Sequence, residues 1–429
     1  MKAWSLRTRL ARTLGFDIPR LNARLTSAGQ ESARMAARIE ALELENARLR
    51  AAPAPVSAPL SPAVPTATRL RDLLSALLDT YESTRGISCD AYCDTPQWHA
   101  MAEAQYLEAV VIAHQAGLLS DAQARLRAKA SVARLQSGAL HRETGVSAQW
   151  GLGFRWQDFP SDEPFLVTTA LVTRALAAAD GLIPCAGLVQ EGFRGLARLP
   201  RREVVINDKA VALPVYAPAL PEVVENTIAL WAQVVLDNPE LSESGSATLR
   251  EAEQALEWLN GSFMPGLGWT YSKTRPVFDL MHQVYILEGL LCCRSINDPE
   301  QLAIETFASF RSGVGYIDSM TLSDRAKAIE SVGRSGKNYI VFRGDRVLTA
   351  RADPARVWSL GGMLGSFGLF AVEGKQPDYW LSQIRRFPVQ MLPEHFGADF
   401  RQEMHLARGA ALALKALRRK ASDTGLSVE

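Results

Sequence analysis

Apolar residues recur three and four positions apart along most of the chain, in segments separated by Gly, Pro and Asp. This is the spacing of one face of an α-helix, and it predicts a mainly helical protein. The segments that follow it are residues 68–83, 99–119, 121–136, 165–179, 222–237, 247–260, 278–293, 299–313 and 400–420. Residues 202–214 and 338–351 instead predict β-hairpins, because their β-rich arms meet at Asn207-Asp208 and Gly344-Asp345, pairs that tight turns favour.

A heptad pattern precedes these segments. Its a and d positions are Leu21, Leu25, Ala28, Ser32, Met35, Ile39, Leu42, Asn46 and Leu49. Asn46 at an a position favours two parallel strands, because a lone buried amide is satisfied by its counterpart on the partner helix. The g residue Arg38 would face Glu43 at an e position of that partner, an attractive pair. The pattern predicts a homo-oligomer held by residues 21–50, and the alternative is a helix that docks on its own chain.

A proline-rich segment separates this helix from the rest. Residues 51–67 are rich in Pro and Ala, which forbids helix and favours an extended spacer. The sequence therefore predicts a basic segment with a coiled coil over residues 1–50, a linker over 51–67 and one helical domain over 68–429.

A weak internal repeat predicts how the helices are arranged. A loop with Gly or Pro and aromatic residues is followed by an acidic or amide residue and then by an unusually apolar helix, with a spacing of roughly fifty to sixty residues. The repeats span residues 150–179, 213–237 and 266–291, with a degenerate copy at 356–372. Helices that are apolar all round are buried, whereas amphipathic ones such as 121–136 form an outer layer. Two concentric rings of helices make an α/α toroid.

Composition and charge narrow the function classes. With 47% hydrophobic and 22% charged residues the chain is an ordinary globular protein, and its formal charge of +1 argues against a nucleic-acid coat. The first residues interrupt their apolar positions with arginines, unlike a secretory signal, so we expect a cytoplasmic protein. Five cysteines, two of them adjacent at Cys292 and Cys293, favour reduced thiols. The basic N-terminus is either a solvated face or a peripheral contact with a membrane.

The loop-and-helix motifs resemble a known family. GLGFRWQDFP followed by PFLVTT, and WTY followed by FDLMHQVYILEGL, are similar to α/α-toroid proteins encoded with bacterial polysaccharide-biosynthesis enzymes. That family is similar in fold to the toroid portions of uronate lyases, heparinase-type enzymes and glucuronyl C5-epimerases. The resemblance covers about residues 85–415, and it implies a toroid that binds a glycan or a glycan precursor.

In such a toroid the loops that precede the inner helices converge on one cleft. Aromatic faces interleaved with carboxylates and cations suit a sugar, whose apolar face stacks on rings while its hydroxyls need polar partners. The candidate substrate-binding residues are Trp156, Asp158, Glu163, Tyr216, Trp269 and Arg275. Trp156 and Trp269 are the expected stacking platforms. The alternative is structural: such aromatics also pack loops onto a core, and acidic residues at helix starts cap backbone N–H groups.

Asp279 and His282 carry the expected chemistry. They lie one helical turn apart, with Tyr285 one turn further along the same stripe, and a carboxylate beside an imidazole is expected to raise its basicity. The resemblance implies that Asn226 neutralises a sugar carboxylate, that His282 is the base and that Tyr271 or Tyr285 is the acid. A buried histidine without a catalytic role is the competing interpretation.

Other chemistries find little support in the sequence. Cys89, Cys93 and His99 have the residue types of a zinc site but lack a fourth ligand with paired spacing. No phosphate-binding G-x-x-x-x-G-K-[ST] loop occurs, and we expect no cofactor. Two functions remain: proton abstraction from an acidic glycan, by an epimerase or a lyase, and a non-catalytic glycan-binding or scaffolding toroid.

Overall fold

The computed structural model describes residues 66–89, 95–140, 142–155, 159–206, 208–241, 247–293, 295–312, 315–335, 337–351, 355–389, 392 and 395–424. The predicted coil of residues 21–50 and the linker up to residue 65 lie outside this part of the chain. Contacts divide the chain into a large unit, residues 59–321 and 353–429, and a second unit that includes residues 322–352. None of the described helices combines the length and the apolar character needed to cross a bilayer.

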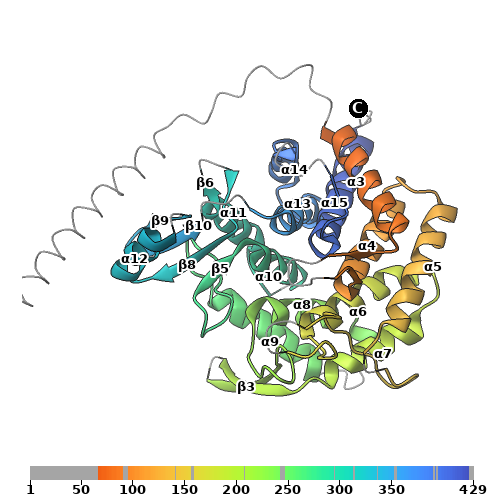
Figure 1. The fold of residues 1–429 in the computed structure, drawn as a ribbon, viewed down its shortest axis with the longest axis horizontal. Helices are drawn as coiled ribbons and strands as arrows, with labels where there is room; N and C mark the ends of the chain where they lie inside the picture. The colour runs from red at the N-terminus through yellow and green to blue at the C-terminus, as the bar shows by residue number, and fades with distance from the viewer. Residues whose placement is uncertain are drawn as a thin grey trace, which may run out of the picture. The chain divides into compact units, whose positions relative to one another are not determined.

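A ring of nearly fully buried helices forms the centre of the large unit. Successive members contact one another and the last contacts the first, so the ring closes (Figure 1). Its members among the described helices are α4 (Ala100–Gln115), α6 (Leu166–Asp180), α8 (Glu225–Asp237), α10 (Leu280–Cys292), α13 (Val357–Glu373) and α15 (Phe400–Thr424). Helices α4, α6, α8 and α10 are apolar around most of their circumference, which is why they occupy the interior.

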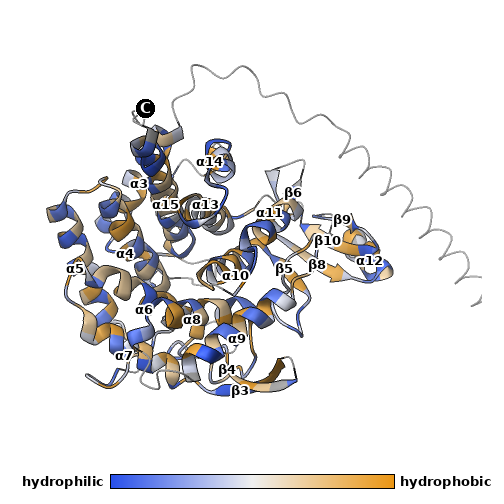
Figure 2. Cartoon of the chain, turned by 180° about the vertical axis from the view of Figure 1, so that it is seen from behind, coloured by the Kyte–Doolittle hydropathy of each residue, from blue (hydrophilic) through white to orange (hydrophobic). Residues whose placement is uncertain are grey.

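A second layer of helices surrounds this ring. Each outer helix contacts a neighbour in the inner ring, and the layer consists of α3 (Thr66–Ser83), α5 (Asp121–Ser137), α7 (Ala186–Ala197), α9 (Ala247–Gly261), α11 (Pro299–Ser309) and α14 (Pro377–Arg385). Helix α5 is amphipathic as expected, since it buries Ala124, Ala128 and Leu135 and exposes polar residues (Figure 2). The two layers are the α/α toroid that the sequence predicts.

Helices α13 and α15 approach each other more closely than they could if side chains stood between their backbones. A Cβ atom on Gly409 would lie 2.1 Å from the carbonyl oxygen of Gly361, and one on Gly361 would lie 2.4 Å from the backbone nitrogen of Leu406. The glycines of α13 therefore serve backbone contact between these helices, whose first turns supply two of the pocket residues described below.

Both predicted hairpins are confirmed. Strands β3 (Arg201–Ile206) and β4 (Lys209–Pro214) pair antiparallel in the large unit, and β9 (Asn338–Arg343) and β10 (Arg346–Arg351) do so in the second unit, where Gly344 has a φ of 62°. In that second unit α12 (Arg325–Ser335) packs on β9 and β10 through Ala328, Ile329 and Ile340.

Further short pairs lie in the loops of the large unit. β5 (Val277–Asp279) pairs with β8 (Ser319–Ser323), β1 (Ile87–Ser88) with β2 (Gln97–Trp98), and β6 (Arg311–Ser312) with β7 (Gly315–Tyr316). The 3-10 turn η1 (Pro239–Leu241) follows α8. The β5–β8 pair leads directly into the start of α10 and thereby fixes the position of Asp279.

Candidate functional site

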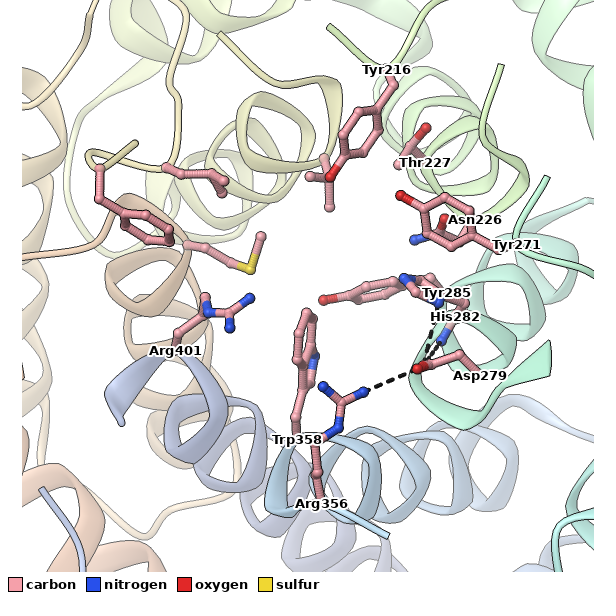
Figure 3. Close-up of a pocket in the computed structure, with 14 residues that line it drawn as sticks. Tyr216, Asn226, Thr227, Tyr271, Asp279, His282, Tyr285, Arg356, Trp358 and Arg401 are labelled. Carbon is pink, nitrogen blue, oxygen red and sulfur yellow. Dashed lines mark hydrogen bonds and ion pairs between the residues drawn. The ribbon is translucent and has the colours of Figure 1, made fainter. Parts of the chain in front are cut away.

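A cavity of about 220 Å³ opens where the inner helices begin. Each inner helix contributes at least one residue from its first two turns, so the pocket lies at one mouth of the ring (Figure 3). Its lining residues are Met101, Leu152, Phe154, Val167, Tyr216, Asn226, Thr227, Tyr271, Asp279, His282, Tyr285, Arg356, Trp358 and Arg401. The set includes Tyr216, Asn226, Tyr271, Asp279, His282 and Tyr285, so the fold brings together these six candidates, whereas Trp269 and Arg275 do not line the pocket.

Asp279 organises one side of the pocket. It is the N-cap of α10, and its Oδ1 accepts hydrogen bonds from the backbone N–H groups of Met281 at 3.0 Å and His282 at 3.3 Å. The Nδ1 atom of His282 lies 3.3 Å from the same oxygen, although the angle is not that of a hydrogen bond. The two side chains therefore lie within ion-pair distance of each other, as the sequence predicts.

Arg356 is a partner of Asp279 that the sequence analysis missed. Its Nη2 lies 3.0 Å from Asp279 Oδ2, and its Nε lies 2.7 Å from Oδ2 of the buried Asp318. Asp318 also accepts hydrogen bonds from the backbone N–H of Arg356 and the hydroxyl of Ser359. One guanidinium therefore links two carboxylates from the β5 and β8 segments.

The pKa of His282 departs from the expected direction. Burial lowers it, Asp279 raises it, and Arg356 lowers it again, with a net pKa below the ordinary value. Asp279 does raise the pKa of this imidazole as expected, but desolvation and the neighbouring guanidinium outweigh the carboxylate. A neutral imidazole with a free lone pair is the form that can accept a proton at neutral pH.

Tyr271 lies directly against His282, with the ring centroids 4.7 Å apart and the rings edge to face. Burial raises the pKa of Tyr271 to about 12, while a hydrogen bond with Tyr216 and the charge of Arg275 lower it. Either of these two hydroxyls can donate to the other.

Tyr285 is bonded differently. His405 Nδ1 lies 2.7 Å from the carbonyl oxygen of Arg401 and must donate to it, which leaves Nε2 as an acceptor. The hydroxyl of Tyr285, 2.6 Å from Nε2, therefore donates to His405. Burial lowers the pKa of His405 to about 3, so this imidazole is neutral. The phenolic proton of Tyr285 is thus directed to His405.

Two arginines lie close to the indole ring of Trp358. The guanidinium carbon of Arg401 lies 4.8 Å from the centroid of Trp358, and that of Arg356 lies 5.6 Å from the same ring. Figure 3 shows Arg401 and the Asp279–His282 pair on different sides of the cavity. Neither arginine nor Trp358 was a candidate in the sequence, because none of them follows a recognisable spacing relative to His282.

A buried ionic network fills the centre of the inner ring beneath the pocket. Arg174 and Arg408 each contact both Glu108 and Glu288, at 2.5 to 3.3 Å. Gln233 accepts a further hydrogen bond from Arg174 at 3.0 Å. These residues lie about two helical turns, or roughly 10 Å, deeper than the first-turn residues of the same helices. Two positive and two negative charges balance, so the axis is filled by a neutral cluster.

Other candidates lie elsewhere. Trp156 and Asp158 are outside the described residues. Trp269 is fully buried and donates its indole N–H to the carbonyl oxygen of Leu259, so its face is not available to a ligand in this structure. Glu163 accepts the backbone N–H of Ala219 at 2.6 Å, which ties two loops together. Arg275 is exposed and covers the outer face of Tyr271 at 5.6 Å.

The described residues offer no obvious metal centre. In this part of the chain no group of three or more His, Cys, Asp or Glu side chains is placed to hold a metal ion. Cys89, Cys185, Cys292 and Cys293 are free thiols.

No protein-family model and no curated protein matches the sequence. Solved structures do match the fold of this chain. A glycoside hydrolase family 76 mannosidase, Bt3792 from Bacteroides thetaiotaomicron, has a TM-score of 0.50 at 10% identity, over 83% of this chain and 99% of that one. The GH76A α-1,6-mannanase from Salegentibacter sp. HEL1_6 gives 0.49 at 10% identity, over 81% and 99%. PssZ from Listeria monocytogenes gives 0.44 at 10% identity, over 82% and 96%. The similarity to Bt3792 supports the α/α toroid fold.

Proposed function

We propose that the pocket binds a sugar unit of an acidic glycan and that proton transfer next to the sugar carboxylate takes place there. The observation that carries this proposal is the position of the His282 imidazole, which lines the pocket and contacts both Asp279 and Tyr271. Such an imidazole can accept a proton at neutral pH, while Asp279 stabilises the imidazolium that forms. Epimerisation and β-elimination share this first step, and both remain open.

The walls of the cavity suit a sugar ring. Met101, Leu152, Phe154 and Val167 contribute apolar groups to the lining, and tyrosine, amide and hydroxyl groups contribute polar ones. A pyranose presents an apolar face and a rim of hydroxyl groups, so both kinds of group find a complement. The solved structures of similar fold include proteins described as a mannosidase and an α-1,6-mannanase, which supports a carbohydrate-active role.

Tyr271 is the better acid of the two tyrosines. The proton of Tyr285 is directed to His405, whereas the hydroxyl of Tyr271 is paired only with another hydroxyl, that of Tyr216, in the interactions described above. Tyr271 also contacts His282, so base and acid are neighbours. We therefore assign the base to His282 and the acid to Tyr271, with Asp279 as the positioning carboxylate.

Glycoside hydrolysis is less well supported. It ordinarily uses two carboxyl groups that flank the scissile bond. Among the described residues that line the pocket, Asp279 is the one carboxylate, and it is bound to Arg356. The same observation favours the second candidate function, a toroid that binds a glycan without turning it over and scaffolds biosynthetic enzymes. The cytoplasmic location and the context of bacterial surface-polysaccharide assembly rest on the sequence and the resemblance alone.

Solvent exchange tests the first function. The protein is incubated in D₂O with mannuronate, glucuronate and galacturonate oligosaccharides, and NMR follows deuterium at C5 while ultraviolet absorbance follows unsaturated products. His282→Ala should lower the rate by about 10²-fold or more, the size of a general-base contribution, with little change in Tm. His114→Ala, at the far end of α4, is the matched control and should keep the parent rate.

The outcomes separate the two functions. If the parent binds these glycans but exchanges no deuterium and forms no unsaturated product, the scaffold function is supported and the enzyme proposal is wrong. If His282→Ala does not fold, His282 is a core residue and the site assignment fails.

A further inference from the structure

We infer that the pocket admits the end of a glycan chain and not its middle, so that the protein acts on one terminal sugar unit. The inference rests on the proposed function and deepens it, because it states which part of an acidic glycan reaches His282. The lining, the floor and the size of the cavity carry it.

Side chains surround the cavity from all around the ring. The inner helices α4, α6, α8, α10, α13 and α15 each place a residue in the lining, and these residues point toward a common central space (Figure 3). Successive members of the ring contact one another, so a sugar chain reaches this space through the mouth and not between two helices.

The loops before the inner helices raise this wall above the helix starts. Leu152 and Phe154 line the cavity from the loop before α6, Tyr216 from the loop before α8 and Tyr271 from the loop before α10. An internal unit of a glycan has a neighbour on each side, and both neighbours would have to leave through the same mouth. A terminal unit has one neighbour and meets no such obstacle.

The floor of the cavity is closed by buried polar side chains that bond one another. Tyr285 lines the pocket, and its hydroxyl lies 2.6 Å from Nε2 of the buried His405. One turn deeper on the same helices, Arg408 contacts both Glu288 and Glu108. Because these side chains fill the axis of the ring, a glycan cannot pass through it and leave at the other end.

The volume of the cavity sets the length of the buried part of the ligand. About 220 Å³ is less than the roughly 300–1,000 Å³ of sites that hold drug-sized ligands. The space therefore suits one sugar ring with its substituents, and the next unit of the chain lies at the mouth.

A closed floor also determines what elimination releases. In a 1→4-linked uronate the C5 proton moves to His282, the C4–C5 double bond forms and the C4–O bond breaks. The oxygen keeps the electron pair of that bond and takes a proton from Tyr271, so His282 ends protonated and Tyr271 deprotonated. The rest of the chain is attached at this oxygen when the reducing-end unit occupies the pocket. Elimination then releases an unsaturated monosaccharide, whereas epimerisation changes a terminal unit alone.

Ligands of increasing length test the inference. Mannuronate, glucuronate and galacturonate oligosaccharides of one to six units are compared by calorimetry at equal concentrations of chains. Units beyond the second should add little, so the affinities for the disaccharide and the hexasaccharide should differ by less than about threefold, with one protein bound per chain. In the exchange assay, deuterium should enter a terminal unit, and any unsaturated product that appears first should be a monosaccharide.

A variant that fills the cavity gives a second measurement. Val167→Trp places a large ring in the pocket and should weaken the binding of the monosaccharide and of the hexasaccharide by the same factor, about tenfold or more. Val205→Trp, at an exposed position of β3, is the matched control and should change neither affinity. If Val167→Trp does not fold, Leu152→Trp on the loop before α6 replaces it.

The outcomes separate the inference from the proposed function. An affinity that rises about tenfold or more from disaccharide to hexasaccharide, deuterium in internal units, or a filled variant that still binds the hexasaccharide would overturn end recognition and leave the proposed function standing. If the uronates do not bind and neutral mannose oligosaccharides bind with the same independence of length, end recognition stands and the proposed function is wrong. If none of these ligands binds, both are wrong.

Discussion

Glu225 gives a sharp test of the electrostatics around the pocket. It is the first residue of α8, next to Asn226, and only 3% of it is exposed. Its Oε2 has no hydrogen-bond partner among the described residues, and its Oε1 accepts one long bond of 3.5 Å from the hydroxyl of Thr270. A carboxylate with so few partners is costly to bury. Burial accordingly raises the pKa of Glu225 to about 7, although the Thr270 bond and the charge of Lys273 oppose the rise.

Because burial raises the pKa of Glu225, its contribution to the stability of the fold falls as the pH rises. In the unfolded chain the carboxyl has an ordinary pKa of 4.5, so between that value and about 7 the folded state holds a proton that the unfolded state has lost. The contribution to stability is fully present below pH 4.5 and is lost as the pH rises through 7. At about 1.4 kcal/mol per pKa unit, the loss amounts to about 3 kcal/mol.

Urea denaturation at several pH values between 5 and 8 measures this loss. Glu225→Gln keeps the shape and cannot ionise, so its free energy of unfolding should stay more nearly constant. The variant should be close to the parent at pH 5 and about 3 kcal/mol more stable at pH 8. Glu203→Gln, on the exposed face of β3, controls for the loss of one negative charge and should follow the parent curve. If the free energies of unfolding of Glu225→Gln and the parent changed in parallel with pH, the effect assigned to Glu225 would be wrong.

Further predictions concern the network, the acid and the assembly. Arg408→Met leaves two buried carboxylates with one arginine and should cost about 3 to 5 kcal/mol in urea denaturation, whereas Lys327→Gln, which breaks an exposed pair with Asp324, should cost under about 1 kcal/mol; equal costs would contradict the buried network. In the exchange assay, Tyr271→Phe should lower turnover far more than Tyr285→Phe, and the reverse order would exchange their roles. Removing residues 1–65 should convert a dimer to a monomer in light scattering while the toroid stays folded, and a monomeric full-length protein would contradict the coil.

The local periodicity of apolar residues was sufficient to predict most elements of the fold. The inner helices α4, α6, α8 and α10 and both hairpins follow directly from apolar spacing and turn residues, because these signals act within a few residues. The short helices α7, α12 and α14 were missed, and α13 was taken only as a degenerate repeat. Its many glycines weaken the helical signal, and their value is visible only when α15 lies against them.

The sequence by itself determined the contacts that lie within one helical turn, and the tertiary structure decided the rest of the site. Asp279 and His282 are near neighbours on any helix that starts at that point, so their pairing was predictable. Arg356, Trp358 and Arg401 reach the pocket only because the ring closes and brings α13 and α15 beside α10 and α4. Whether a side chain is buried also depends on parts of the chain that are distant in sequence. Trp269, in the loop between α9 and α10, and Trp358, in the first turn of α13, are the same residue type, yet packing places one in the core and the other at the cavity. The pKa of His282 follows the same rule, since desolvation and a guanidinium from a distant segment outweigh the carboxylate one turn away.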